Sequence, residues 1–191
     1  MRSKPLTFLF SIALFHALLM AAPTLGQEIA LDVDIGRSTV EFTLADVLHT
    51  VHGHFKIRTG AIRFDPSTNK ISGDVVVDAA SGESGSEGRD RRMHKNILES
   101  GRYPDIVFSP DRVDGTVAAQ GASDVRVHGL FRIHGAAHEI TLPVHVQMAD
   151  GKATATTHFT IPYVKWGMKN PSNLLLRVSD KVDIDITAYT R

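Results

Sequence analysis

Alternation of apolar and polar residues along most of this chain constrains its fold more than any other feature. In STVEFTL, for example, Val40, Phe42 and Leu44 take one parity while polar residues take the other. The pattern recurs in VHGHFKI, AIRFD, ISGDVVVD, DVRVHGLFRIHG, EITLPVHVQ, ATATTHFTI and KVDIDITAY. Because successive side chains of a strand point to opposite faces, each run predicts a strand with one apolar face. Turn-forming residues separate the runs, so we expect roughly eight to ten antiparallel strands in an all-β barrel or sandwich.

Two stretches interrupt the alternation. SGESGSEG, at 81–88, has the composition of a flexible polar linker. The following RDRRMHKNILES places Met93 and Ile97 four residues apart, which predicts one short amphipathic helix near 87–100 with RDRR on its solvated face. The stretch 162–176 holds the only tryptophan of the chain and reads as a long connection, of the kind that is usually functional or mobile in a small β domain.

The first 26 residues are expected to be a secretory signal rather than part of the fold. Arg2 and Lys4 precede an apolar run, and small residues lead to a plausible cleavage site between Gly26 and Gln27. Residues 27–191 then form one domain of 165 residues. We therefore expect the mature protein to be periplasmic or secreted.

Composition excludes several classes of function. Loss of Arg2 and Lys4 from 21 basic residues, against 21 acidic ones, leaves a mature net charge of −2, so nucleic acid is not an expected partner. The chain has no cysteine, which excludes disulfides, thiolate catalysis and thiolate–zinc sites. Such a domain has to be held together by its own apolar core, and its length is sufficient for one.

The segment HTVHGHFK, at 49–56, contains three histidines and raises the alternative of a metal site. His52 and His54 have the spacing of a cupin-type ligand pair on a strand, but no carboxylate follows four or five residues later. They also share their parity with Lys56, so we expect both imidazoles to face solvent and predict no metal site and no catalytic residue. His49 lies on the opposite parity, but a regular strand is not established at its position, so its direction is left open.

The residues predicted to face inward include many phenylalanines, with the smaller glycine and alanine at several positions between them. Alternation alone leaves open whether this face forms an ordinary core or surrounds a lumen. An eight-stranded barrel has a size at which either is feasible, because its interior can be filled by side chains or can hold one small ligand.

The order of motifs along the chain resembles the YceI-like family of bacterial lipid- or polyisoprenoid-binding proteins. The segments are VEF, VHGHF, GAIRFDP, Arg89-Asp90 before a helix, YPDIVFSP, VHGLFRIHG, TLPV and the closing VSDKVDIDI. Together they span about residues 28–190. Family members often carry a histidine soon after the VEF strand, but the matching ADVLHT is one residue shorter, so no role is transferred to His49.

The resemblance implies a lipocalin-like antiparallel β-barrel of about eight strands, partly closed by the helix. Its lumen would hold a long amphiphilic lipid such as a polyisoprenoid or an isoprenoid quinone, without catalysis and without a cofactor. We predict that the inward aromatic residues line this lumen: Phe42, Phe55, Phe64, Phe108, Phe131, Phe159 and Trp166. Tyr163 and Arg177 are predicted as polar groups at its mouth.

Two other functions remain as alternatives to lipid binding. One is a cupin-type metalloenzyme that uses His52 and His54. The other is an envelope protein-interaction module without a ligand. Transient contact with a membrane or an envelope partner and the oligomeric state stay open at this point.

Overall fold

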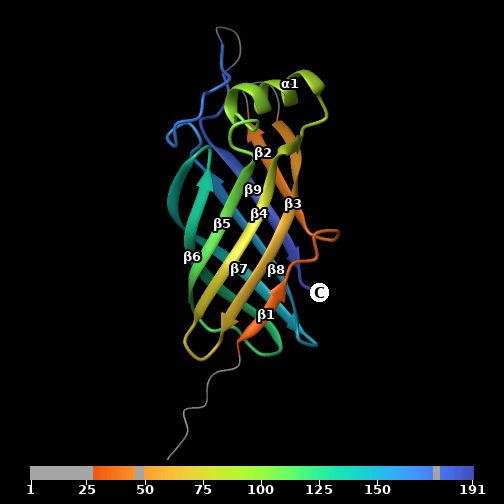
Figure 1. The fold of residues 1–191 in the computed structure, drawn as a ribbon, viewed down its shortest axis with the longest axis vertical. Helices are drawn as coiled ribbons and strands as arrows, with labels where there is room; N and C mark the ends of the chain where they lie inside the picture. The colour runs from red at the N-terminus through yellow and green to blue at the C-terminus, as the bar shows by residue number, and fades with distance from the viewer. Residues whose placement is uncertain (1–27, 46–49, 174–176) are drawn as a thin grey trace, which may run out of the picture.

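A computed structural model describes residues 28–45, 50–173 and 177–191. In these residues nine antiparallel strands and one short helical segment are present (Figure 1). The strands are β1 (Ile29–Asp32), β2 (Thr39–Ala45), β3 (Thr50–Asp65), β4 (Lys70–Glu83), β5 (Asp105–Asp114), β6 (Gly121–Ile133), β7 (Ala136–Ala149), β8 (Lys152–Ile161) and β9 (Val182–Tyr189). The helical segment consists of α1 (Glu87–Arg92) and a π-helical turn, η1 (Met93–Ile97). The predicted helix near 87–100 is therefore confirmed.

Hydrogen bonding between β3 and β4 closes the sheet into a barrel. The first two strands share one place in this barrel, because β1 pairs with the far half of β3 and β2 pairs with its near half. An isolated bridge between Val33 and Thr190 keeps the connection between β1 and β2 beside β9. Among the described residues the barrel thus has eight strand positions, which confirms the predicted fold.

β3 is one long strand that contains a β-bulge. The sequence pattern indicated two separate runs, at 50–58 and 61–65, but the structure joins them in one strand of 16 residues. Two register shifts against β4 occur in this strand, between His54 and Lys56 and between Ile57 and Thr59. A bulge inserts an extra residue and exchanges the faces of all residues beyond it. Phe55 and Phe64 can therefore both face the interior although their parities differ.

Two apolar clusters fill different parts of the barrel. The larger cluster includes Val40, Phe42, Phe131 and Ile184 and lies beneath the helical segment. The smaller one is centred on Phe64, Val113, Val125 and Val127, with Ile29 and Leu31 of β1 packed against it. Figure 1 shows α1 at one end of the long axis and β1 at the other, so the two clusters divide the barrel along its length.

Part of the expected linker is strand. β4 continues through Glu83, and Lys56 donates its backbone N–H to the Ser81 hydroxyl at 2.8 Å. A side chain at Gly82 would approach the Met93 methyl within 2.7 Å, so glycine lets strand and helix pack closely here. In the part of the chain that the structure describes, no helix combines the length and hydrophobicity needed to cross a membrane.

Candidate functional site: an apolar cavity below the helical segment

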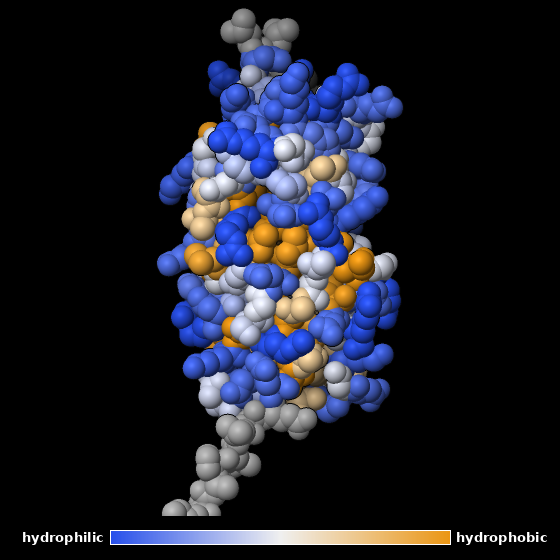
Figure 2. All heavy atoms as spheres, viewed as in Figure 1, coloured by the Kyte–Doolittle hydropathy of each residue, from blue (hydrophilic) through white to orange (hydrophobic). Residues whose placement is uncertain are grey.

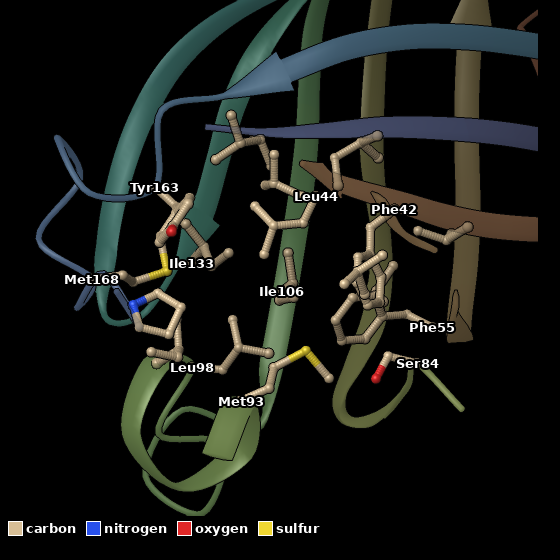
Figure 3. Close-up of a pocket in the computed structure, with 18 of the residues that line it drawn as sticks. Phe42, Leu44, Phe55, Ser84, Met93, Leu98, Ile106, Ile133, Tyr163 and Met168 are labelled. Atoms are coloured by element: carbon tan, nitrogen blue, oxygen red, sulfur yellow. The ribbon is translucent and has the colours of Figure 1, made fainter. Parts of the chain in front are cut away.

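A cavity of about 440 Å³ occupies the half of the barrel that lies beneath α1 and η1 (Figure 3). Aliphatic and aromatic side chains from all strands except β1 and β7 form its wall. The alternation explains this composition, because the inward parity of every strand is apolar. The volume is within the range of small-molecule binding sites.

The helical segment closes one end of the cavity. Met93 and Leu98 project from it toward the interior, opposite Ile106 and the two phenylalanines of β2 and β3 (Figure 3). Leu98 is buried, and its backbone N–H donates to the Met93 carbonyl at 2.9 Å. The expected amphipathic helix thus presents its apolar face to the barrel interior.

The connection after β8 covers another side of the same end. Tyr163 and Met168 are both buried and line the cavity. The Tyr163 hydroxyl donates a hydrogen bond of 2.7 Å to the Ser179 carbonyl, which ties the beginning of the connection to its end. Burial, assisted by the nearby Asp180 carboxylate, raises the pKa of Tyr163 to about 12. This side chain therefore stays neutral over the physiological range.

Four of the seven predicted lining residues are on the cavity wall: Phe42, Phe55, Phe131 and Phe159. The rings of Phe42 and Phe55 have centroids 5.4 Å apart, and those of Phe131 and Phe159 are 6.1 Å apart. Both separations are typical of tilted or edge-on aromatic packing. Contact between these rings and a ligand stays a prediction.

The structure places the other three predicted residues away from the cavity wall. Phe64 belongs to the smaller cluster near β1, and Phe108 packs against both clusters. Trp166 stacks on His138, with ring centroids 4.0 Å apart and planes 5° from parallel. Burial lowers the pKa of His138. Parity correctly predicted that Phe64 and Phe108 face the barrel interior, but it does not tell where along the barrel axis each one lies.

The two residues predicted for the mouth have different surroundings. Tyr163 is on the cavity wall, although its hydroxyl is already engaged by Ser179. Arg177 is exposed and does not line the cavity. Sequence reasoning missed the charged groups that do line it near the helix, Arg89 and Arg92. For Arg89 the sequence held a signal: Arg89, Met93 and Ile97 follow one another at intervals of four residues, which places them on one face of a helix.

The conspicuous histidines of β3 lie on the outer surface. His52 Nδ1 and the Thr43 hydroxyl form a hydrogen bond of 3.1 Å, and His54 Nε2 lies 3.8 Å from a Glu83 carboxylate oxygen. Both histidines are exposed, as the parity predicted. His49 lies outside the described residues. The described residues contain no group of three or more histidine, cysteine, aspartate or glutamate side chains that could hold a metal ion.

Comparison with known proteins agrees with this architecture. The sequence profile of the YceI-like domain matches residues 31–189. The chain therefore belongs to the YceI-like family. Among curated proteins, no sequence matches it significantly.

Solved structures share the fold at low sequence identity. BcnA of Burkholderia cenocepacia is similar with a TM-score of 0.70 and 20% identity, over 84% of this chain and 100% of that one. A polyisoprenoid-binding domain from Saccharophagus degradans, implicated in plant cell wall breakdown, gives 0.68 and 16%, over 85% and 98% of the two chains. A Campylobacter jejuni YceI protein gives 0.61 and 20%, over 75% and 85%.

Proposed function

We propose that this protein binds an amphiphilic lipid in its cavity, and that it carries or sequesters this lipid without catalysing a reaction. The observation that carries the proposal is an apolar cavity of about 440 Å³ enclosed by a barrel and a helix. Each methylene group that leaves water for such a site contributes about 0.8 kcal/mol. The description of the similar Saccharophagus degradans domain as polyisoprenoid-binding supports the same class of ligand.

Recovery of a lipid from the native protein is the direct test. The protein is purified from its own host, and native mass spectrometry is combined with organic extraction. The proposal expects a mass excess that extraction removes, and an extracted lipid of matching mass. A neutral apolar fluorophore, N-phenyl-1-naphthylamine, should bind the emptied protein saturably.

Two substitutions in β5 provide a matched comparison. Ile106 lines the cavity, whereas its neighbour Val107 has the opposite parity and pairs with Arg132 on the outer face. Ile106→Trp should abolish saturable fluorophore binding because the larger ring occupies the cavity, and Val107→Trp should leave it unchanged. Equal binding by both variants, together with no lipid in the native protein, would overturn the proposal.

We also propose that the protein is exported, which agrees with the same role. Residues 1–26 have the layout of a secretory signal, and we propose that the mature chain begins at Gln27 in the periplasm or outside the cell. A carrier in that compartment would meet its lipid at a membrane or on an envelope partner. Amino-terminal sequencing of the protein from its host tests the cleavage position, and an intact Met1 or a cytoplasmic location would contradict it.

A further inference from the structure

The cavity wall is apolar except at the end that the helical segment covers. Of the described residues that line it, Arg89 and Arg92 are the only charged ones, and both belong to α1. No described carboxylate lines the cavity to balance them. The space-filling view shows that hydrophilic residues cover this end of the molecule, while apolar residues are visible along the middle of the barrel (Figure 2).

Helical geometry directs these two arginines to one face. They are three residues apart, and Gly88, Met93 and Ile97 on the same face also line the cavity. Arg91, which lies between them, is exposed and does not line it. The helix thus presents two guanidinium groups at the cavity end and turns a third away.

One of the two guanidinium groups is fixed and the other is free. Arg89 donates from Nε to the Ser84 hydroxyl at 2.7 Å and from a terminal nitrogen to the Ser84 carbonyl at 2.6 Å. Asp90, the nearest acidic residue along the helix, accepts hydrogen bonds from the Ser84 backbone N–H and hydroxyl. No hydrogen bond or ion pair within the described part of the chain engages the Arg92 guanidinium. Because this side chain is exposed, its donors are accessible to a ligand headgroup.

The volume limits the length of chain that fits below these arginines. The cavity has a finite volume of about 440 Å³, so only a limited length of alkyl chain is buried in it. The barrel beyond the cavity holds the cluster of Phe64, Val113, Val125 and Val127 and offers no continuation. A much longer polyprenyl chain would have to leave part of its length outside.

We propose that the cavity selects a single-chain amphiphile with an anionic headgroup, which Arg89 and Arg92 bind at the helix end. This inference rests on the proposed lipid-binding function and specifies the ligand class. A planar guanidinium matches the paired oxygens of a carboxylate or a phosphate, and the exposed position lets the headgroup remain partly hydrated. The chain contributes affinity through burial, and the arginines contribute selectivity for charge.

Displacement of N-phenyl-1-naphthylamine from the mature protein tests the headgroup. The competitors are palmitate, hexadecyl phosphate and the neutral hexadecanol, each below its micelle concentration. A charge-assisted contact should make at least one anion bind about tenfold more tightly than the alcohol. Preference for either anion supports the proposal and identifies the headgroup as carboxylate or phosphate.

Three arginine variants separate the site from general surface charge. Arg89→Gln and Arg92→Gln should each weaken binding of the preferred anion several-fold to about tenfold and leave hexadecanol unaffected. Arg91→Gln is the matched control, because it removes the same charge from the other face, and should change neither affinity. An equal loss with Arg91→Gln, or equal binding of the anions and the alcohol, would overturn the proposed headgroup site while lipid binding itself still stood.

A series of fatty acids tests the length. Affinity should rise with each added methylene until the chain fills the cavity and then level off, because further carbons remain in water. A continued rise to much longer chains would refute the length limit. If neither the fluorophore nor any alkyl competitor binds, the proposed lipid-binding function fails as well, and this outcome is distinct from the loss of selectivity alone.

Discussion

Gly53, between the two outward histidines of β3, is a position where a single added methyl group should destabilise the fold. A Cβ atom there would lie closer than 3.0 Å both to the Phe42 ring and to the Glu83 carbonyl oxygen. The ring can shift, but the carbonyl belongs to the backbone of β4, which is hydrogen-bonded in the barrel. Overpacking of this kind costs about 1–3 kcal/mol, and the rigid neighbour places Gly53→Ala toward the upper end.

Thermal unfolding followed by circular dichroism measures this cost. For a domain of this size, 2 to 3 kcal/mol corresponds to a fall in Tm of about 5–10 °C. His52→Ala is the matched control, since it removes an exposed side chain one residue away and should change the free energy of unfolding by less than about 0.5 kcal/mol. Gly53→Ala should also weaken fluorophore binding, because Phe42 lines the cavity and its ring must move.

A double variant shows whether the ring carries part of the effect. Phe42→Leu removes the atoms that approach Gly53 but leaves the Glu83 carbonyl in place. The combined variant should therefore be more stable than the sum of the two single changes predicts, by about 0.5 kcal/mol or more. Strict additivity, or a Gly53→Ala protein as stable as His52→Ala, would refute the argument that close approach requires glycine here.

Three further predictions concern pH and the mouth of the cavity. Because burial and Asp180 raise the pKa of Tyr163 from 10.0 to about 12, neutral Tyr163 stabilises the fold below pH 10, and this contribution is lost as the pH rises through about 12. The free energy of unfolding of the Tyr163→Phe variant, measured at increasing pH, should not show this loss of stability. Hydrogen bonds led by that from the Ser67 hydroxyl lower the pKa of Asp65, so its contribution is present above pH 3.8 and is lost as the pH falls through the lower folded value. Asp65→Asn should therefore be less stable than the original at neutral pH and converge with it in acid, as urea unfolding at several pH values would show. Gly88→Trp should block binding of every alkyl ligand without loss of Tm, because the cavity-lining Gly88 has open space around its missing Cβ.

The sequence predicted most of the barrel because a single physical rule, the period of two in a strand, operates in nearly every element. It identified the inward faces of β2, β6 and β9 and the outward direction of His52 and His54. The rule fails where a bulge changes the register, and Ile57 and Thr59 flank such a point in β3. Two short predicted strands are one long strand for this reason.

The site was harder to predict than the fold, because parity says whether a residue faces inward but not how far along the barrel it lies. Phe55 and Phe64 are both interior residues, yet the first lines the cavity and the second fills the opposite half. Strand register decides this, and register depends on pairings between distant segments. The arginines were overlooked because a charged run on a short helix usually faces solvent, although the four-residue spacing of Arg89, Met93 and Ile97 indicated that Arg89 shares the apolar face.

The division of the barrel into a filled half and a hollow half explains how the fold can keep a cavity. An apolar cavity of about 440 Å³ forfeits packing interactions that a filled core would make, which lowers the stability of the empty protein. The closed hydrogen-bonded barrel and the cluster around Phe64 supply stability that does not depend on a ligand. An apolar chain that fills the cavity recovers much of the missing packing. The same hollow that lowers the stability of the empty protein therefore provides the driving force for binding.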